Sequence, residues 1–182
     1  MFRLYRLADI VRLNPSKLSK PLEAVALEEL RKRYEGYKDK DLGIVIAIVN
    51  VNVDPEGVIP LGDGASYHKV TFDVLSYIPI VNEVVEGSVS TVGRMGVTVK
   101  LGPLEGFVHI SQISDEEARY DPLHNAIVIG PGKKILAQGD IVRARITSAS
   151  FGAQTRMPRI SMTMRQPYLG KLEWIKEKPG KK

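Results

Sequence analysis

The sequence predicts an α+β domain followed by an all-β barrel domain. In the first half, one amphipathic helical pattern stands among apolar segments that are rich in β-branched residues. From residue 87 onward, short alternating segments are separated by glycine turns, a pattern typical of a small barrel. With 182 residues, 43% of them hydrophobic, the chain can bury two modest cores. We therefore expect domains at residues 1–82 and 83–182.

The N-terminal domain is predicted as an antiparallel sheet with one main helix, an RNP-like α+β arrangement. Ser19 is expected to cap the helix, with Pro21 and Glu23 in its first turn. A core-facing stripe follows, formed by Leu22, Val25, Ala26, Leu30 and Tyr34. The expected strands are residues 1–13, 44–53, 58–61 and 67–78, with Asp54-Pro55-Glu56-Gly57 as a type I turn that starts a hairpin.

Two motifs in this half have both a functional and a structural interpretation. Gly62-Asp63-Gly64 could be a phosphate loop, but no helix follows it to offer free N–H groups, so a turn is favoured. His68 shares its predicted strand face with Val70, Phe72 and Val74. A packed histidine is therefore favoured over a catalytic base.

The second half is predicted to form the strands of an OB-type barrel, interrupted by an extra hairpin. Expected strands start at residues 87, 97 and 107 and span 141–146 and 159–164; the hairpin pairs 125–129 with 134–137. Residues 114–125 should form a helical turn and a loop. Gly130-Pro131-Gly132-Lys133 is expected to be a hairpin turn, because it lacks the full spacing of a nucleotide-binding loop. Residues 167–178 are predicted to form a short helix that packs on the body or binds a partner, and residues 179–182 to fray.

The composition disfavours several classes of function. The chain has no cysteine, and its three histidines, His68, His109 and His124, lack the spacing of metal ligands, so we expect no metal and no cofactor. No clustered carboxylates point to catalysis. No apolar run approaches the roughly 18 residues of a membrane span, and arginines interrupt the start where a signal peptide needs apolar residues. A cytoplasmic protein without membrane contact is expected.

The charge is distributed unevenly along the chain. Residues 1–86 hold 11 Lys and Arg against 13 Asp and Glu, a net charge of −2. Residues 87–182 hold 15 against 8, a net charge of +7. A one-sided positive charge favours a polyanionic partner, because neutralised phosphates release counterions; a solvated basic surface is the alternative.

Four ordered blocks of the second half resemble the RNA-binding OB module named after ribosomal protein S-one. These are the segment that begins at Gly87, Gly-Phe-Val-His-Ile-Ser at 106–111, Gly-Asp-x-Val at 139–142 and Arg-Ile-Ser-Met at 159–162. The whole chain resembles the E′-type stalk subunits of archaeal DNA-directed RNA polymerase, the counterparts of the seventh subunit of the eukaryotic enzyme. The segments that carry this resemblance are MFRLYRLADIVRL, GDGASYHKVTF, VNEVVEGSV, LGPLEGFVHISQI and MTMRQPYLGKLEW.

The resemblance implies a non-catalytic subunit that forms a stalk heterodimer with a small helical subunit. The N-terminal domain would dock on the RNA polymerase core, and the OB module would contact single-stranded nascent RNA and support transcription initiation and elongation. An RNA-binding translation-initiation or exosome-cap factor is the alternative, because such proteins use the same module.

The expected RNA-binding face departs from the module's usual pattern. Met95 and Thr98 stand where aromatic residues are common, so Phe107 is the candidate for base stacking; a subunit contact is its alternative role. Stacking contributes roughly 1–3 kcal/mol per base, so we expect weak, mainly electrostatic binding. The predicted RNA-binding residues are Lys100, Phe107, His109, Arg143, Arg145, Arg156 and Arg159.

Overall fold

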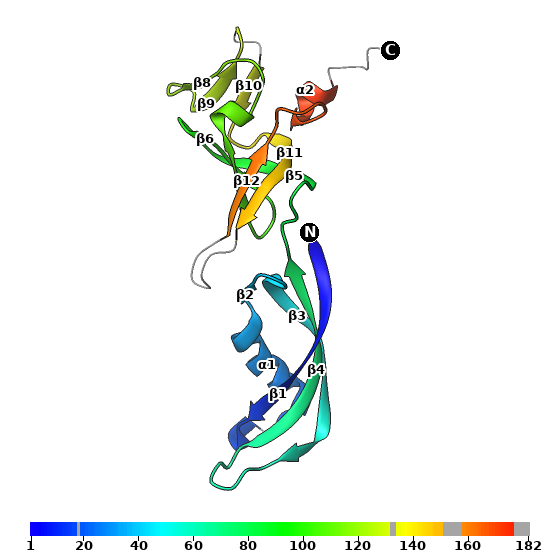
Figure 1. The fold of residues 1–182 in the computed structure, drawn as a ribbon. Helices are drawn as coiled ribbons and strands as arrows, with labels where there is room; N and C mark the ends of the chain where they lie inside the picture. The colour runs from blue at the N-terminus through cyan, green and yellow to red at the C-terminus, as the bar shows by residue number, and fades with distance from the viewer. Residues whose placement is uncertain (18, 132–133, 151–157, 177–182) are drawn as a thin grey trace. The chain divides into compact units, whose positions relative to one another are not determined.

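The computed structural model describes residues 1–17, 19–131, 134–150 and 158–176. Contacts within the chain divide it into two compact units, Met1–Ile78 and Pro79–Lys182 (Figure 1). The first unit contains β1 (Phe2–Leu13), the 3-10 turn η1 (Pro15–Lys17), α1 (Leu22–Tyr34), β2 (Lys38–Asp39), β3 (Gly43–Val58) and β4 (Ser66–Tyr77). Its sheet has the order β1-β4-β3-β2, and adjacent strands are antiparallel.

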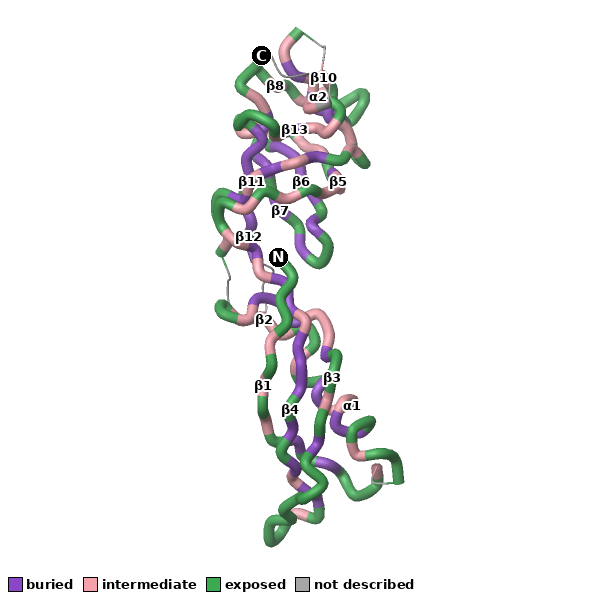
Figure 2. Tube along the Cα trace, turned by 90° about the vertical axis from the view of Figure 1, so that its right-hand side faces the viewer, coloured by how far each residue is buried: buried purple, intermediate pink, exposed green. Residues whose placement is uncertain are grey.

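The helix α1 packs on one face of this sheet, as Figure 1 shows. The predicted stripe is confirmed: Val25, Ala26 and Leu30 are buried in a core with apolar residues of β1, β3 and β4, and Leu22 and Tyr34 pack against it. The central strand β4 contributes Val70, Phe72 and Val74 and is mostly buried (Figure 2). Alternate residues of these strands and the apolar stripe of α1 together form the core.

The start of α1 differs from the prediction. The residue before the first turn is Pro21, with φ −52° and ψ 135°, and no side chain caps the helix there. A capping side chain must come from the residue next to the first turn to reach its free N–H groups. Ser19 lies two positions too early for this, so its predicted capping role is wrong.

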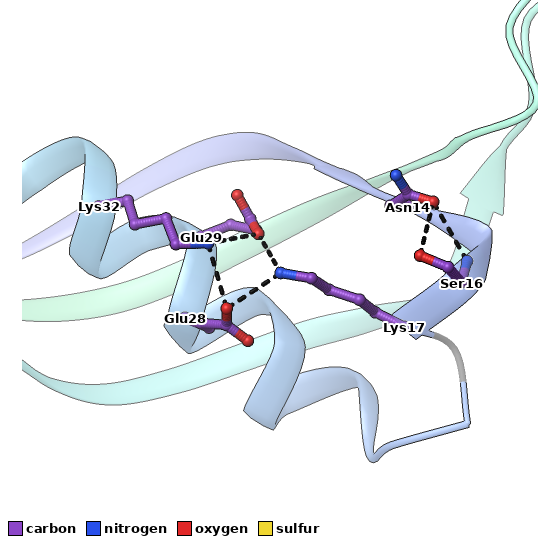
Figure 3. A network of polar contacts seen from close by, with 6 residues as sticks. All are labelled: Asn14, Ser16, Lys17, Glu28, Glu29 and Lys32. Carbon is purple, nitrogen blue, oxygen red and sulfur yellow. Dashed lines mark hydrogen bonds and ion pairs between the residues drawn. The ribbon is translucent and has the colours of Figure 1, made fainter.

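A charged network connects the chain before α1 to the second turn of the helix (Figure 3). Lys17 Nζ lies 3.0 Å from Glu28 Oε1 and 2.8 Å from Glu29 Oε1, and Lys32 Nζ contacts the same two oxygens at 3.1 and 3.3 Å. Hydrogen bonds from Lys17 and then Lys32 lower the pKa of Glu28 to about 2. The two lysines thereby neutralise two adjacent carboxylates.

The expected turn and hairpin at residues 54–61 are wrong, because β3 continues to Val58. Val53 pairs with Val70 and Gly57 with His68, so β3 uses two more residues than β4 over this interval. The His68 ring occupies the space above Gly57: a Cβ built on Gly57 would lie 2.4 Å from His68 Nε2. The ring also pairs with the Asp54 carbonyl at 2.8 Å. Asp54-Pro55-Glu56 is therefore a bulge, and His68 is the packed histidine that its strand face predicts.

The second unit contains a closed barrel of OB topology. Its strands are β5 (Val84–Gly93), β6 (Gly96–Lys100), β7 (Glu105–His109), β11 (Ile141–Ser150) and β12 (Arg159–Thr163). They follow the order β12-β7-β6-β5-β11, and β11 pairs with β12 to close the barrel. The pairing of β12 with β7 is parallel, whereas the other pairings are antiparallel. The predicted barrel is confirmed, and inward-facing residues such as Val97, Val108 and Ile146 are fully buried.

The segment between β7 and β11 forms a small sheet with the order β10-β9-β8. After the 3-10 turn η2 (Ile110–Gln112), it contains β8 (Ala118–Asp121), β9 (Ala126–Ile129) and β10 (Lys134–Ala137). The pairing of β9 with β10 confirms the predicted hairpin. The loop expected at residues 114–125 is partly wrong, because β8 pairs with β9 through Tyr120 and Ile127. Acidic and arginine residues in this segment obscure the alternation that would indicate a half-exposed strand.

The C-terminal helix begins later than predicted. It is preceded by β13 (Gly170–Lys171), which pairs with β11, and within the described residues α2 is Leu172–Lys176. Lys171 Nζ lies 3.0 Å from Asp140 Oδ1 and 2.9 Å from Glu173 Oε2, and its side chain is only 16% exposed. This ion-paired lysine fixes the segment to the barrel. The residues expected to fray lie outside the described part of the chain.

Candidate nucleic-acid interface

Strand alternation brings several predicted RNA-binding residues to the outer surface of β6, β7 and β12. On β7, Gly106 and Val108 face the core, whereas Phe107 and His109 are exposed. Lys100 is exposed at the end of β6, and Arg159 is exposed at the start of β12. The period of two along a strand accounts for this arrangement.

A groove with a volume of about 510 Å³ crosses this surface. Residues of all three strands and of two adjoining loops line it: Thr98, 103–107 and 158–161. Phe107 is 39% exposed, so part of its ring is available to a ligand. The groove thus combines one aromatic ring with the guanidinium group of Arg159.

Phe107 lies in the middle of a cross-strand row. Thr98 is its partner on β6, and Ser161 is its partner on β12. Both neighbours carry a hydroxyl group, which can donate and accept hydrogen bonds. A base stacked on Phe107 would therefore have hydroxyl groups on either side.

Arg143 and Arg145 lie outside the groove, at the start of β11. Arg159 pairs with Ser150, five positions further along β11 than Arg145. At about 3.3 Å per residue, that separation is roughly 17 Å along the strand. Arg143 is already neutralised, because its Nη2 lies 2.8 Å from Glu86 Oε1. Arg145 is half-buried, and its Nε atom is enclosed without a hydrogen-bond acceptor.

The other predicted residues have different surroundings. Lys100 pairs in register with Glu105, which lines the groove and places a negative charge beside it. His109 lies at the N-terminus of η2, where its Nδ1 contacts Ser111 Oγ at 2.8 Å and accepts a hydrogen bond from Ser111 N. Arg156 lies outside the described residues. The structure therefore brings Phe107 and Arg159 together in the groove, with Lys100 next to it.

Ser161 is a groove residue that the sequence analysis missed. Its position could have been found from alternation, because it lies two residues beyond Arg159 on the same strand. Its contact with the Phe107 row depends on the parallel pairing of β7 and β12, which joins segments more than fifty residues apart. Local sequence pattern does not specify that pairing.

The described residues include no group of three or more His, Asp or Glu side chains that could hold a metal ion. In the same part of the chain, no helix has the length and apolar character needed to cross a membrane.

Family comparisons agree with the two folds. Residues 8–64 match the SHS2 domain found in the N terminus of Rpb7p/Rpc25p/MJ0397. Residues 78–148 match the S1 RNA-binding domain. The fold and the groove thus define a chain that joins an SHS2 domain to an S1 RNA-binding domain.

Similarity to individual proteins identifies the family more narrowly. The chain is 50% identical to DNA-directed RNA polymerase subunit Rpo7 of Saccharolobus solfataricus, over 96% of this chain and 97% of that protein. It is 46% identical to Rpo7 of Sulfolobus acidocaldarius, over 100% and 98%. It is 28% identical to DNA-directed RNA polymerase II subunit rpb7 of Schizosaccharomyces pombe, over 94% and 99%. The chain belongs to the Rpo7 family of DNA-directed RNA polymerase subunits, which are accessory and non-catalytic.

Proposed function

We propose that this chain docks on DNA-directed RNA polymerase, pairs there with a small helical subunit, and guides emerging single-stranded RNA along the β6–β7–β12 groove. In this role it supports initiation and elongation. Full-length similarity to Rpo7 supports the assembly and disfavours a translation-initiation or exosome-cap factor. The observation that carries the RNA-guiding role is the exposed Phe107 ring beside Arg159 in the groove. Archaea have no nucleus, so its archaeal relatives imply that it works in the cytoplasm.

The groove suits weak binding of single-stranded RNA. Phe107 can stack on an unpaired base, Thr98 and Ser161 can hydrogen-bond to base edges or ribose hydroxyls, and Arg159 can contact a phosphate. Met95 is 67% exposed but offers no aromatic ring. One stacking platform supports micromolar or weaker affinity, which increases when the polymerase holds the RNA nearby.

A titration of the full chain with a labelled single-stranded oligonucleotide tests the RNA-guiding role. Phe107→Ala should weaken binding by roughly 1–3 kcal/mol, the contribution of one stacked base. Tyr168→Ala is the matched control, because Tyr168 is an exposed aromatic residue (73%) that does not line the groove. Equal affinities for the Phe107→Ala variant and the unchanged protein would overturn the proposal.

We propose that the N-terminal unit docks on the polymerase through an apolar loop, defined as residues 58–61. Its side chains Val58, Ile59 and Leu61 are 69%, 66% and 107% exposed, although all three are apolar. Exposed apolar residues that cluster at one place commonly mark an interaction site. The apolar loop begins at Val58, the last residue of β3, and the β3 residues from Asp54 to Val58 are exposed.

Co-purification tests this docking. Leu61→Asp in the full chain should reduce recovery of polymerase subunits, because it places a charge in an apolar contact. Leu123→Asp is the control, since Leu123 is also strongly exposed (89%) but belongs to the second unit. Undiminished recovery with Leu61→Asp would exclude the apolar loop as the docking element, whereas recovery of ribosomes or exonuclease subunits instead of polymerase would overturn the assembly itself.

A further inference from the structure

The carboxylate of Asp63 accepts several hydrogen bonds directly beside the apolar loop. Arg12 donates from Nε to Oδ2 at 2.9 Å and from Nη2 to Oδ1 at 2.8 Å. Tyr67 Oη donates to Oδ2 at 2.8 Å, and the Ala65 amide donates to Oδ1 at 3.1 Å. Two side chains and one backbone amide therefore converge on this carboxylate.

The donors and the acceptor come from different kinds of structure. Arg12 and Tyr67 are direct partners in the register of β1 and β4, so paired strands hold both donors in place. Asp63 lies in the connection between β3 and β4, and its amide donates to the Pro60 carbonyl of the apolar loop at 3.2 Å. Asp63 thus contacts the end of the sheet through its carboxylate and the apolar loop through its backbone amide.

The connection needs such a contact to adopt one conformation. Glycines flank Asp63 on both sides, and Gly62 has φ 90°, a conformation that glycine adopts without strain. A Cβ built on Gly62 or Gly64 would meet no atom within 4 Å, so packing around them does not restrict the backbone. The hydrogen bonds of Asp63 supply contacts that can orient this segment.

We propose that Asp63 is a positioning residue that holds the apolar loop in the conformation that docks on the polymerase. The inference rests on the proposed docking through residues 58–61. Exposed ion pairs contribute little to global stability, and the side chains of Arg12 and Asp63 are 52% and 30% exposed. A carboxylate held by several donors does, however, restrict the loop, and a binding segment ordered in advance loses less conformational entropy when it docks.

The electrostatics of the cluster agree with this role. Hydrogen bonds from Arg12, then Tyr67 and Ala65, hold the pKa of the Asp63 carboxyl well below its usual range. Asp63 therefore remains charged at any pH at which the polymerase would be assayed, and the charge on which its contact with Arg12 depends is retained under those conditions.

Association of the full chain with RNA polymerase lacking this subunit tests the inference. Asp63→Asn and Arg12→Gln should each slow association by about tenfold and leave the dissociation rate unchanged, because only the ordered fraction of loops is competent to dock. Arg12→Lys, which retains one charged donor group, should slow association less than Arg12→Gln does. Asp54→Asn is the control: it makes the same charge change near the loop, at a carboxylate whose hydrogen bond is to the Glu56 amide.

Thermal unfolding of each variant separates positioning from stability. Similar midpoints for Asp63→Asn and Asp54→Asn, together with slow association of the former alone, support the inference. If Asp63→Asn associates normally while Leu61→Asp still prevents docking, the inference is wrong. The proposed docking through the apolar loop then stands. If Leu61→Asp also docks normally, both the docking proposal and this inference are wrong.

Discussion

Gly106 of β7 faces the end of the Met162 side chain of β12 so closely that a side chain at position 106 would force Met162 to shift. A Cβ built on Gly106 would lie 2.6 Å from Met162 Cε and 2.8 Å from Sδ. Met162 is buried at 2% exposure, and Ile160 is the register partner of Gly106 on β12. The approach lies within the pairing of β12 with β7, which places Ser161 beside Phe107.

The alanine substitution Gly106→Ala should destabilise the barrel. The added methyl group overpacks a filled core, which costs about 1–3 kcal/mol. Calorimetry of the full chain should show a lower unfolding temperature for the second unit. Gly93→Ala is the matched control in the same barrel, because its Cβ would meet no atom closer than 3.9 Å. Equal unfolding temperatures for the two variants would contradict the packing argument.

Arg143 and Arg159 should affect RNA binding differently, although both were predicted contacts. Arg159→Gln removes a groove cation, so the slope of log affinity against log salt should fall by about 0.7, the value for one phosphate of a single strand. Arg143→Gln should leave the slope unchanged, because Glu86 already neutralises this arginine. Titrations at several salt concentrations measure both slopes. A larger change of slope for Arg143→Gln than for Arg159→Gln would indicate that RNA contacts β11 rather than the groove.

The contact between Asp63 and Arg12 is partly exposed, so it should add only a small amount to the stability of the first unit, and only above acidic pH. Because the pKa of Asp63 is lower in the folded than in the unfolded chain, its contribution is present above the unfolded value near 3.9 and is lost as pH falls through the folded value. The difference in unfolding temperature between the unchanged protein and Asp63→Asn should therefore shrink in acid. A difference that grows as pH falls would refute the lowered pKa.

Lys17 should contribute to the low pKa of Glu28. Lys17→Met removes the contacts of Lys17 with Glu28 and Glu29 and leaves Lys32 as their shared cation. The pKa of Glu28, about 2 in the folded protein, should then rise toward its ordinary value, which NMR titration of the side chain can measure. Lys20→Met is the control. An unchanged titration of Glu28 would show that Lys32 alone sets its pKa.

Residues with a strong periodic pattern could be placed from sequence, whereas those positioned by distant pairings could not. The stripe of α1 and the alternation around Phe107 specify a buried face directly. Asp54-Pro55-Glu56-Gly57 has the composition of a turn, but pairing with β4 continues past it, and the space above Gly57 holds the His68 ring. Tertiary packing thus overrode a local signal.

The candidate interface shows the same division. Alternation predicts which residues of β7 and β12 face outward, and these include Phe107 and Arg159. Sequence alone gives no register between β11 and β12, so it could not separate Arg143 and Arg145 from the groove. Neither could it reveal that Glu86 neutralises Arg143, since these two residues lie 57 positions apart in the chain.

The bulge in β3 has a consequence for how the length of this strand can vary. Val53 and Gly57 are separated by four residues, and their partners Val70 and His68 by two, so the surplus is an even number. An even surplus returns Gly57 to the face of the sheet on which Val53 lies, and the His68 ring covers it there. Deletions or insertions of two residues at 54–56 would therefore change the reach of the apolar loop while Gly57 still faces His68.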